Sequence, residues 1–71
     1  MELATMKTWH EDKGYGFAEP DLGGIPIFVH AVAFDPDERP RKGDRIEIEI
    51  EQAPKGLRAK TATVLKNKYE V

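Results

Sequence analysis

The stretch Lys13-Gly14-Tyr15-Gly16-Phe17 places two aromatic residues at alternate positions, with a glycine before and between them. In a β-strand, residues two apart project from the same face of the sheet, so both rings would share one face. The glycines leave no bulk beside the rings and let another backbone or a flat ligand approach closely. Exposed rings on a strand, next to a cation such as Lys13, form a surface on which unpaired bases stack. The alternative is that one ring belongs to the core and that Gly14 only forms a turn.

Length and composition limit the fold and the type of partner. With 71 residues, the chain has room for one small domain. It has no cysteine, so disulfides and thiolate zinc sites are excluded, and this composition fits the reducing cytoplasm in which we expect the protein to act. No apolar run approaches the roughly 20 residues that span a membrane, and no signal peptide is visible. The formal net charge of −2 argues against binding nucleic acid mainly by bulk electrostatics, but permits stacking helped by a few placed cations.

Local patterns predict short strands separated by turns. The predicted strands are residues 3–10, 15–19, 25–30, 45–51 and 57–65. Pro26 should confine the start of the third strand to a sheet edge or a bulge. In the fifth strand, the small apolar residues change parity between Ala59 and Ala62, which suggests a bulge there.

Five strands, a long loop at 35–43 and no helical stretch predict an all-β fold, a small barrel that leaves no sheet edge unpaired. The domain is expected to cover residues 1–66, followed by a frayed C-terminal tail at 67–71. The core is expected to be aliphatic, built from Ile27, Val29, Ile46, Ile48, Ile50 and Val64.

Placing the first three strands side by side gathers most of the rings into one patch. This predicted aromatic platform consists of Trp9, Tyr15, Phe17, Phe28 and His30. Because the aliphatic residues suffice for the core, the rings are available for binding, and exposed apolar patches usually mark binding sites. Trp9 fits the core equally well, and Phe34 fits a barrel end better than a binding role. His30 fits the platform better than a metal site, because His10 is the only other histidine.

The chain resembles the bacterial cold-shock domain family. Lys13-Gly14-Tyr15-Gly16-Phe17 resembles the first ribonucleoprotein motif (RNP1) of that family, and Ile27-Phe28-Val29-His30 resembles the second (RNP2). Glycine-containing turns at 20–24, 42–44 and 55–56 also fall where the family has them, so the resemblance covers residues 4–65. Thr8-Trp9 stands in place of the usual Trp-Phe pair, as in a divergent subgroup, while His10 replaces an asparagine and Ala31 an aromatic residue.

This resemblance implies a five-stranded antiparallel OB-fold barrel that binds single-stranded RNA or DNA and acts as an RNA chaperone. It implies base stacking by the aromatic platform and phosphate contacts by basic residues beside it. The candidates for phosphate contact are Lys7, Lys13, Arg58 and Lys60. The candidates for a loop clamp at the rim of the barrel, which are otherwise ordinary solvated charges, are Arg39, Arg41 and Lys42.

Other functional classes fit less well. An RNA-recognition motif (RRM) domain shares the first motif, but it needs an earlier strand with a second motif and two helices. Catalysis has little support, because the chain has neither serine nor cysteine as a nucleophile and no phosphate-binding glycine loop. We therefore expect a monomeric binding module for single-stranded RNA or DNA, not an enzyme, without metal, cofactor or membrane association. The alternative is an OB-like barrel that has lost nucleic-acid binding and docks a protein partner, which the negative charge and the absent rings at Thr8 and Ala31 favour.

Overall fold

The computed structural model describes residues 1–65, which form five strands and one turn of 3-10 helix. The elements are β1 (Glu2–His10), β2 (Tyr15–Pro20), β3 (Ile27–His30), η1 (Ala31–Ala33), β4 (Arg45–Ala53) and β5 (Gly56–Val64). Residue 66 of the expected domain and the expected tail at 67–71 lie outside the described residues. Within residues 1–65, no helix has the length and apolar character that crossing a membrane requires.

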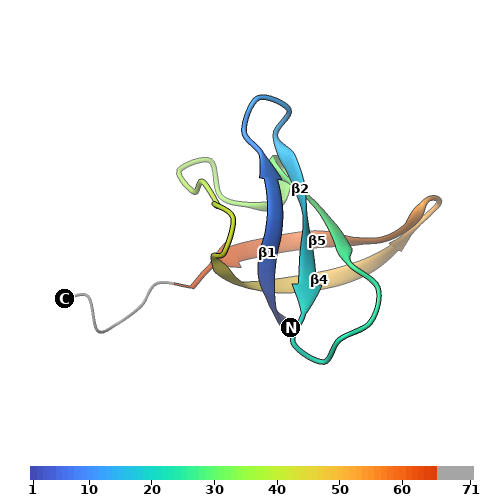
Figure 1. Cartoon of the computed structure of the whole chain (residues 1–71). Coiled ribbons are helices and arrows are strands. Elements are labelled where there is room, and N and C mark those ends of the chain that lie inside the picture. Colours follow the sequence, from blue (N-terminus) through green and yellow to red (C-terminus); the bar gives the residue numbers. More distant parts are fainter. Residues whose placement is uncertain (66–71) are drawn as a thin grey trace.

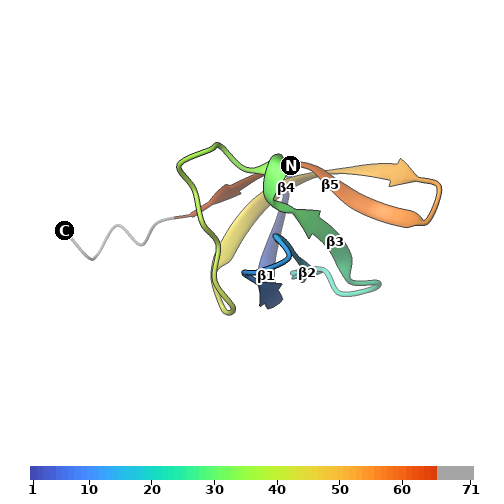
Figure 2. The ribbon, with the colours of Figure 1, turned by 90° about the horizontal axis from the view of Figure 1, so that it is seen from above.

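The strands close into a barrel in the order β1-β2-β3-β5-β4, which confirms the predicted all-β barrel (Figure 1, Figure 2). Neighbouring strands are antiparallel except at the closure, where β3 and β5 run parallel. The predicted five-stranded barrel is confirmed, and only this pair departs from the antiparallel arrangement expected for its strands. The reason is geometric: strand direction cannot alternate all the way around a closed ring of five, so one pair must be parallel.

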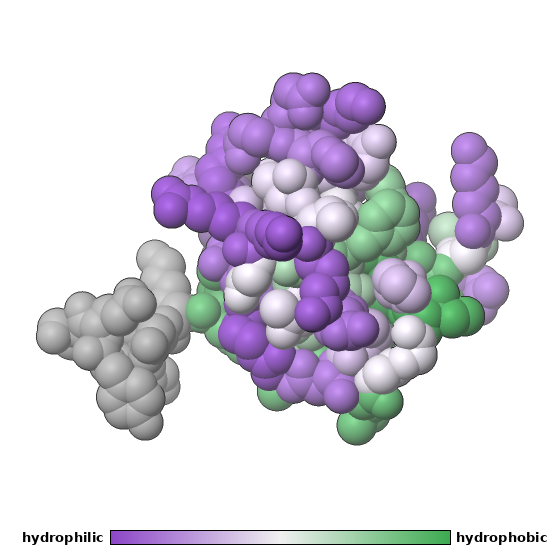
Figure 3. Space-filling model, in the orientation of Figure 1, coloured by the Kyte–Doolittle hydropathy of each residue, from purple (hydrophilic) through white to green (hydrophobic). Residues whose placement is uncertain are grey.

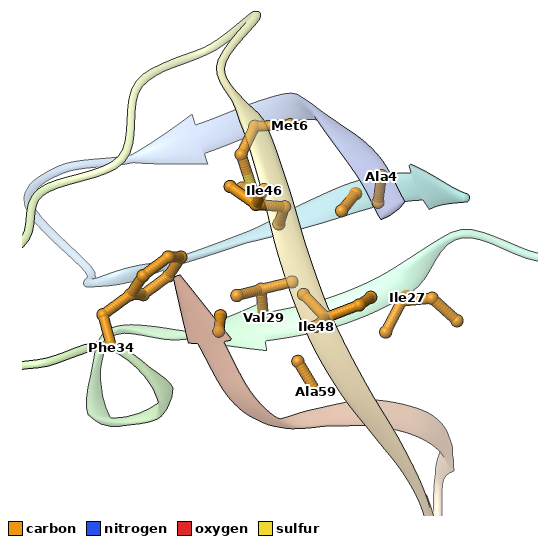
Figure 4. Packing of buried hydrophobic residues seen from close by; sticks show 10 residues of the cluster. Ala4, Met6, Ile27, Val29, Phe34, Ile46, Ile48 and Ala59 are labelled. Atoms are coloured by element: carbon orange, nitrogen blue, oxygen red, sulfur yellow. The ribbon is translucent and has the colours of Figure 1, made fainter. Parts of the chain in front are cut away.

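The core is a single cluster to which every strand contributes inward side chains (Figure 4). The predicted core residues Ile27, Val29, Ile46 and Ile48 are at most 1% exposed, whereas Ile50 and Val64 are partly buried against the cluster. The cluster also contains residues that the aliphatic pattern did not predict, namely Ala4, Met6, Ala18, Phe34, Ala59 and Ala62. A small barrel encloses little volume, so alanines fit where larger side chains would collide.

Two β-bulges change which side chains face inward. Opposite β2, the register of β1 shifts between Met6 and Thr8, which leaves Lys7 as the extra residue. Opposite β4, Thr61 and Ala59 pair with consecutive residues, so Lys60 is the extra residue of β5. The predicted bulge between Ala59 and Ala62 is confirmed, and it buries both alanines.

The loop between β2 and β3 is fastened to the barrel by Arg45. Its two terminal nitrogens donate to the carboxylate oxygens of Asp21, each at 2.6 Å, and Nη1 also donates to Thr5 Oγ1 at 2.8 Å. These hydrogen bonds lower the pKa of the Asp21 carboxyl below its ordinary value.

The loop between β2 and β3 ends later than expected, since β3 begins at Ile27 and not at 25. Pro26 has no N–H to donate to a neighbouring strand, which agrees with its predicted restriction of this strand.

Candidate nucleic-acid interface

Gly16 sets how closely β1 approaches β2. A Cβ atom at this position would lie 2.0 Å from the carbonyl oxygen of Thr8, so the two backbones meet where any larger residue would collide. The glycines were expected to let another backbone or a flat ligand approach closely. At Gly16 this close neighbour is the backbone of β1. Beside it, the Thr8 hydroxyl accepts a hydrogen bond from the Phe17 N–H at 3.2 Å. Thr8 thus holds the strand that carries Phe17.

The outer face of β1, β2 and β3 carries side chains in two rows across the strands. The first row, at the β1–β2 turn, consists of His10, Tyr15 and His30, which are cross-strand neighbours. The second row consists of Thr8, Phe17 and Phe28. Five of these six side chains carry rings, and we call them the ring cluster: His10, Tyr15, Phe17, Phe28 and His30.

Contacts between the rings make the cluster continuous. Phe28 is its centre, with ring centroids 5.5 Å from Tyr15, 5.8 Å from Phe17 and 6.4 Å from His30. The ring of His10 lies 5.3 Å from Tyr15. Phe17 is 41% exposed, His10 and His30 are exposed, and Tyr15 and Phe28 are half-buried. Four of the five predicted platform residues therefore lie together, joined through Phe28, and Tyr15 links them to His10.

Trp9 lies apart from the ring cluster. Its ring packs edge-on against Phe34, with centroids 6.1 Å apart, and its indole N–H donates to Glu11 Oε1 at 3.2 Å. Phe34 is 6% exposed and belongs to the core, so the interpretation that it caps the barrel is supported. The bulge at Lys7 explains the position of Trp9: one extra residue turns Trp9 inward and His10 outward. An isolated glycine in a strand, here Gly16, is the sequence signal that could have revealed this bulge.

His30 is oriented by the backbone that follows it. Its Nδ1 accepts a hydrogen bond from the Val32 N–H at 3.1 Å, at the start of η1. A nitrogen that accepts a hydrogen bond carries no proton, so the neutral imidazole holds its proton on Nε2. The exposed His30 ring is therefore fixed at the edge of the ring cluster, with an N–H donor at Nε2.

The four candidates for phosphate contact differ in their partners. Lys7 forms an ion pair with Glu19 at 3.4 Å, and Arg58 Nε lies 2.6 Å from Glu51 Oε2. Arg58 is also the partner of Phe28 where β5 runs parallel to β3, so it lies beside the second row. Lys13 and Lys60 are exposed, and neither forms an ion pair within residues 1–65.

The basic loop residues Arg39, Arg41 and Lys42 are exposed, in the connection from η1 to β4. The Gly43 N–H donates to the carbonyl of Met6 at 2.7 Å, so the end of this loop lies against β1. In both ribbon views the loop and the projecting β4–β5 hairpin extend from opposite sides of the barrel (Figure 1, Figure 2). A clamp by these residues would act at the β1 side, and it stays a prediction.

An apolar groove of about 710 Å³ continues the second row toward the β4–β5 hairpin. Phe17 and Phe28 form one wall, while Ile25, Pro26 and Leu57 contribute further apolar lining. Figure 3 shows the hydrophobic surface gathered on the side of the barrel from which this hairpin projects. The strand pattern did not predict the groove, because it joins a loop to a distant hairpin.

Comparison with known protein families identifies the fold and its general activity. The family model described as "'Cold-shock' DNA-binding domain" matches residues 2–65 of the chain. The chain belongs to this family. It is 41% identical over 63 residues to the cold shock-like protein CspA of Shewanella violacea, covering 86% of the chain and 90% of that protein. It is 36% identical over 67 residues to the major cold shock protein of Micrococcus luteus, covering 92% of the chain and all of that protein. Membership supports nucleic-acid binding as the general activity of this cold-shock domain, and its barrel is the OB-fold expected for the family.

Proposed function

We propose that this cold-shock domain binds single-stranded RNA or DNA by stacking bases on the ring cluster, and that it acts as an RNA chaperone. The observation that carries this proposal is the continuous set of rings on an outer sheet face. The core cluster is complete without Phe17 and Phe28, so packing of the barrel does not require either ring to face inward. An exposed aromatic surface of this kind is suited to a ligand with flat faces.

Stacking explains why the ligand should be single-stranded. In a duplex the base faces are covered by their neighbours, whereas an unpaired strand can turn successive bases onto separate rings. The rows have the spacing of alternate strand residues, about 7 Å, and neighbouring strands lie about 5 Å apart. An extended strand can therefore place bases over both rows, with Lys13 and Arg58 near opposite ends of the ring cluster for its phosphates.

Chaperone activity follows from binding energy alone. A protein that binds the open form of an RNA shifts its folding equilibrium by its difference in affinity for the two forms, without a nucleotide cofactor. Stacking is tolerant of sequence, because every base has a π face. We expect the protein to act as a monomer in the cytoplasm, with neither metal nor catalysis involved.

Titration with an oligothymidylate of about six to eight nucleotides tests the proposal, a length within the range of OB-fold sites. Calorimetry should show saturable binding, and a duplex of the same length should bind much more weakly. Phe17→Ala should weaken binding by about 1–3 kcal/mol, the usual worth of one stacked base. Thr63→Ala, an exposed substitution on β5 outside the ring cluster, is the matched control. No binding up to millimolar concentration would refute the proposal and favour docking of a protein on the same face.

A further inference from the structure

His10 occupies the end of the first row, where β1 runs into its turn. It pairs directly with Tyr15 across the β1–β2 ladder, and the two rings lie 5.3 Å apart at 60°. The side chain is exposed, as is that of His30 on the other side of Tyr15. The first row therefore carries a ring on each of the three strands, whereas the second row has Thr8 in place of a ring on β1.

The surroundings of His10 hold its backbone and leave its ring accessible. Its carbonyl accepts hydrogen bonds from the N–H groups of Lys13 at 3.1 Å and Gly14 at 2.7 Å, which closes the turn tightly. Trp9 and Glu11 are hydrogen-bonded to each other, and alternation along β1 puts Trp9 on the opposite face from His10. The nearby carboxylate of Glu11 is thus engaged with Trp9, while the exposed Lys13 lies in the same turn as His10.

We propose that His10 forms a further base-stacking subsite, which binds one nucleotide of a single strand at the turn end of the ring cluster. Lys13 contacts the phosphate of that nucleotide. Histidine rings are among those on which unpaired bases stack, and a cation beside the ring suits the adjoining phosphate. This inference rests on the proposed function, because it extends the same binding face by one position.

The subsite offsets the missing ring at Thr8. The hydroxyl of Thr8 is engaged by the Phe17 N–H, so this residue supports the strand and offers no stacking surface. With His10 in the first row, β1 still contributes one ring, displaced two residues toward the turn. A bound strand would accordingly cross β1 beside Lys13 and not beside the bulge at Lys7, whose ammonium is paired with Glu19.

Affinity for an oligothymidylate of seven nucleotides, measured by calorimetry, tests the subsite through three variants. His10→Ala should bind about fivefold more weakly or worse, from the loss of one stacked base. His10→Phe should bind within about twofold of the wild type, because it keeps a ring. His10→Asn should be as weak as His10→Ala. Unchanged affinity of His10→Ala, or wild-type affinity of His10→Asn, would overturn the stacking subsite. Failure of the wild-type protein to bind would instead refute the proposed function.

Proton NMR gives a second readout, in which binding is followed on the wild-type protein itself. The chain has two histidines, so two imidazole Hε1 signals are expected, and the His10→Phe spectrum assigns them. Saturation with the same oligonucleotide should move the His10 signal upfield, as a base ring stacks on it. A His10 signal that stays in place while the His30 signal moves would show binding without the proposed subsite.

Discussion

Replacing Gly16 with alanine should break the pairing of β1 with β2. The added Cβ would lie 2.0 Å from the Thr8 carbonyl oxygen and 2.9 Å from both the Thr8 carbonyl carbon and Trp9 Cα, whereas ordinary contacts are 3.4–4 Å. All three atoms are backbone, so no side-chain rotation relieves the collision, and the strands must separate by more than about 1 Å. That movement would stretch the 3.2 Å hydrogen bond from the Phe17 N–H to Thr8. Overpacking costs about 1–3 kcal/mol and sometimes more, and we expect at least 3 kcal/mol here.

Urea denaturation followed by circular dichroism measures this loss. A domain of this length has a total stability of about 4–10 kcal/mol, so Gly16→Ala should lose a third of it or more. Gly23→Ala is the matched control, since its φ is +83° but no atom lies within 4 Å of the new Cβ. The control should lose about 1–2 kcal/mol, the cost of the left-handed backbone. If Gly16→Ala is no less stable than Gly23→Ala, the approach of β1 to β2, and with it the register of the ring cluster, is wrong.

Three further predictions separate core, ion pair and phosphate contact. In thermal melts, Ile48→Ala should lower the free energy of unfolding by about 2–5 kcal/mol, because Ile48 is fully buried. Phe17→Ala should lower it by less than about 1 kcal/mol, because Phe17 is exposed. Equal losses would mean that the inner and outer faces of the sheet are inverted. The pKa of Asp21 is lowered in the folded state by hydrogen bonds from Arg45, so its stabilising effect is present above its ordinary value of 3.8 and is lost as pH falls through the lower folded value. Melts below pH 3.8 should therefore show a smaller acid-induced loss for Asp21→Asn than for the wild type, and identical profiles would contradict this. In salt titrations, Lys13→Ala should make the slope of log K against log salt shallower by about 0.7, one phosphate contact; an unchanged slope would remove Lys13 from the interface.

The parts of the fold that depend on alternation could be predicted from the sequence. The isoleucines of β4 alternate with glutamates and enter the core, and the parity change between Ala59 and Ala62 revealed the bulge in β5. The parallel β3–β5 pair was missed, although closing five strands requires one such pair. Strand patterns describe each strand by itself, whereas closure is a property of the whole ring.

The candidate site was predictable where inward and outward side chains alternate along a strand without a bulge. Phe17 and Phe28 lie on the face that alternation assigned to them, but the bulge at Lys7 exchanges the orientations of Trp9 and His10. One extra residue in a strand moves every later side chain to the opposite face of the sheet, and the sequence of β1 itself contains no signal for it. Ion pairs such as the one between Lys7 and Glu19 depend on the resulting register, so they could not be foreseen either.

The affinity of the wild-type protein for an oligothymidylate of seven nucleotides, measured over a range of salt concentrations, tests most directly whether stacking carries the binding. Lys13, in the turn at His10, and Arg58, which pairs with Phe28, are the candidates beside the ring cluster, and the net charge is −2, so about two phosphate contacts are expected. At about −0.7 per contact for single strands, log K should fall against log salt with a slope near −1.4, and substantial affinity should persist at 1 M salt. A slope of about −4 or steeper, with binding abolished at high salt, would show that basic residues and not the ring cluster provide most of the binding free energy.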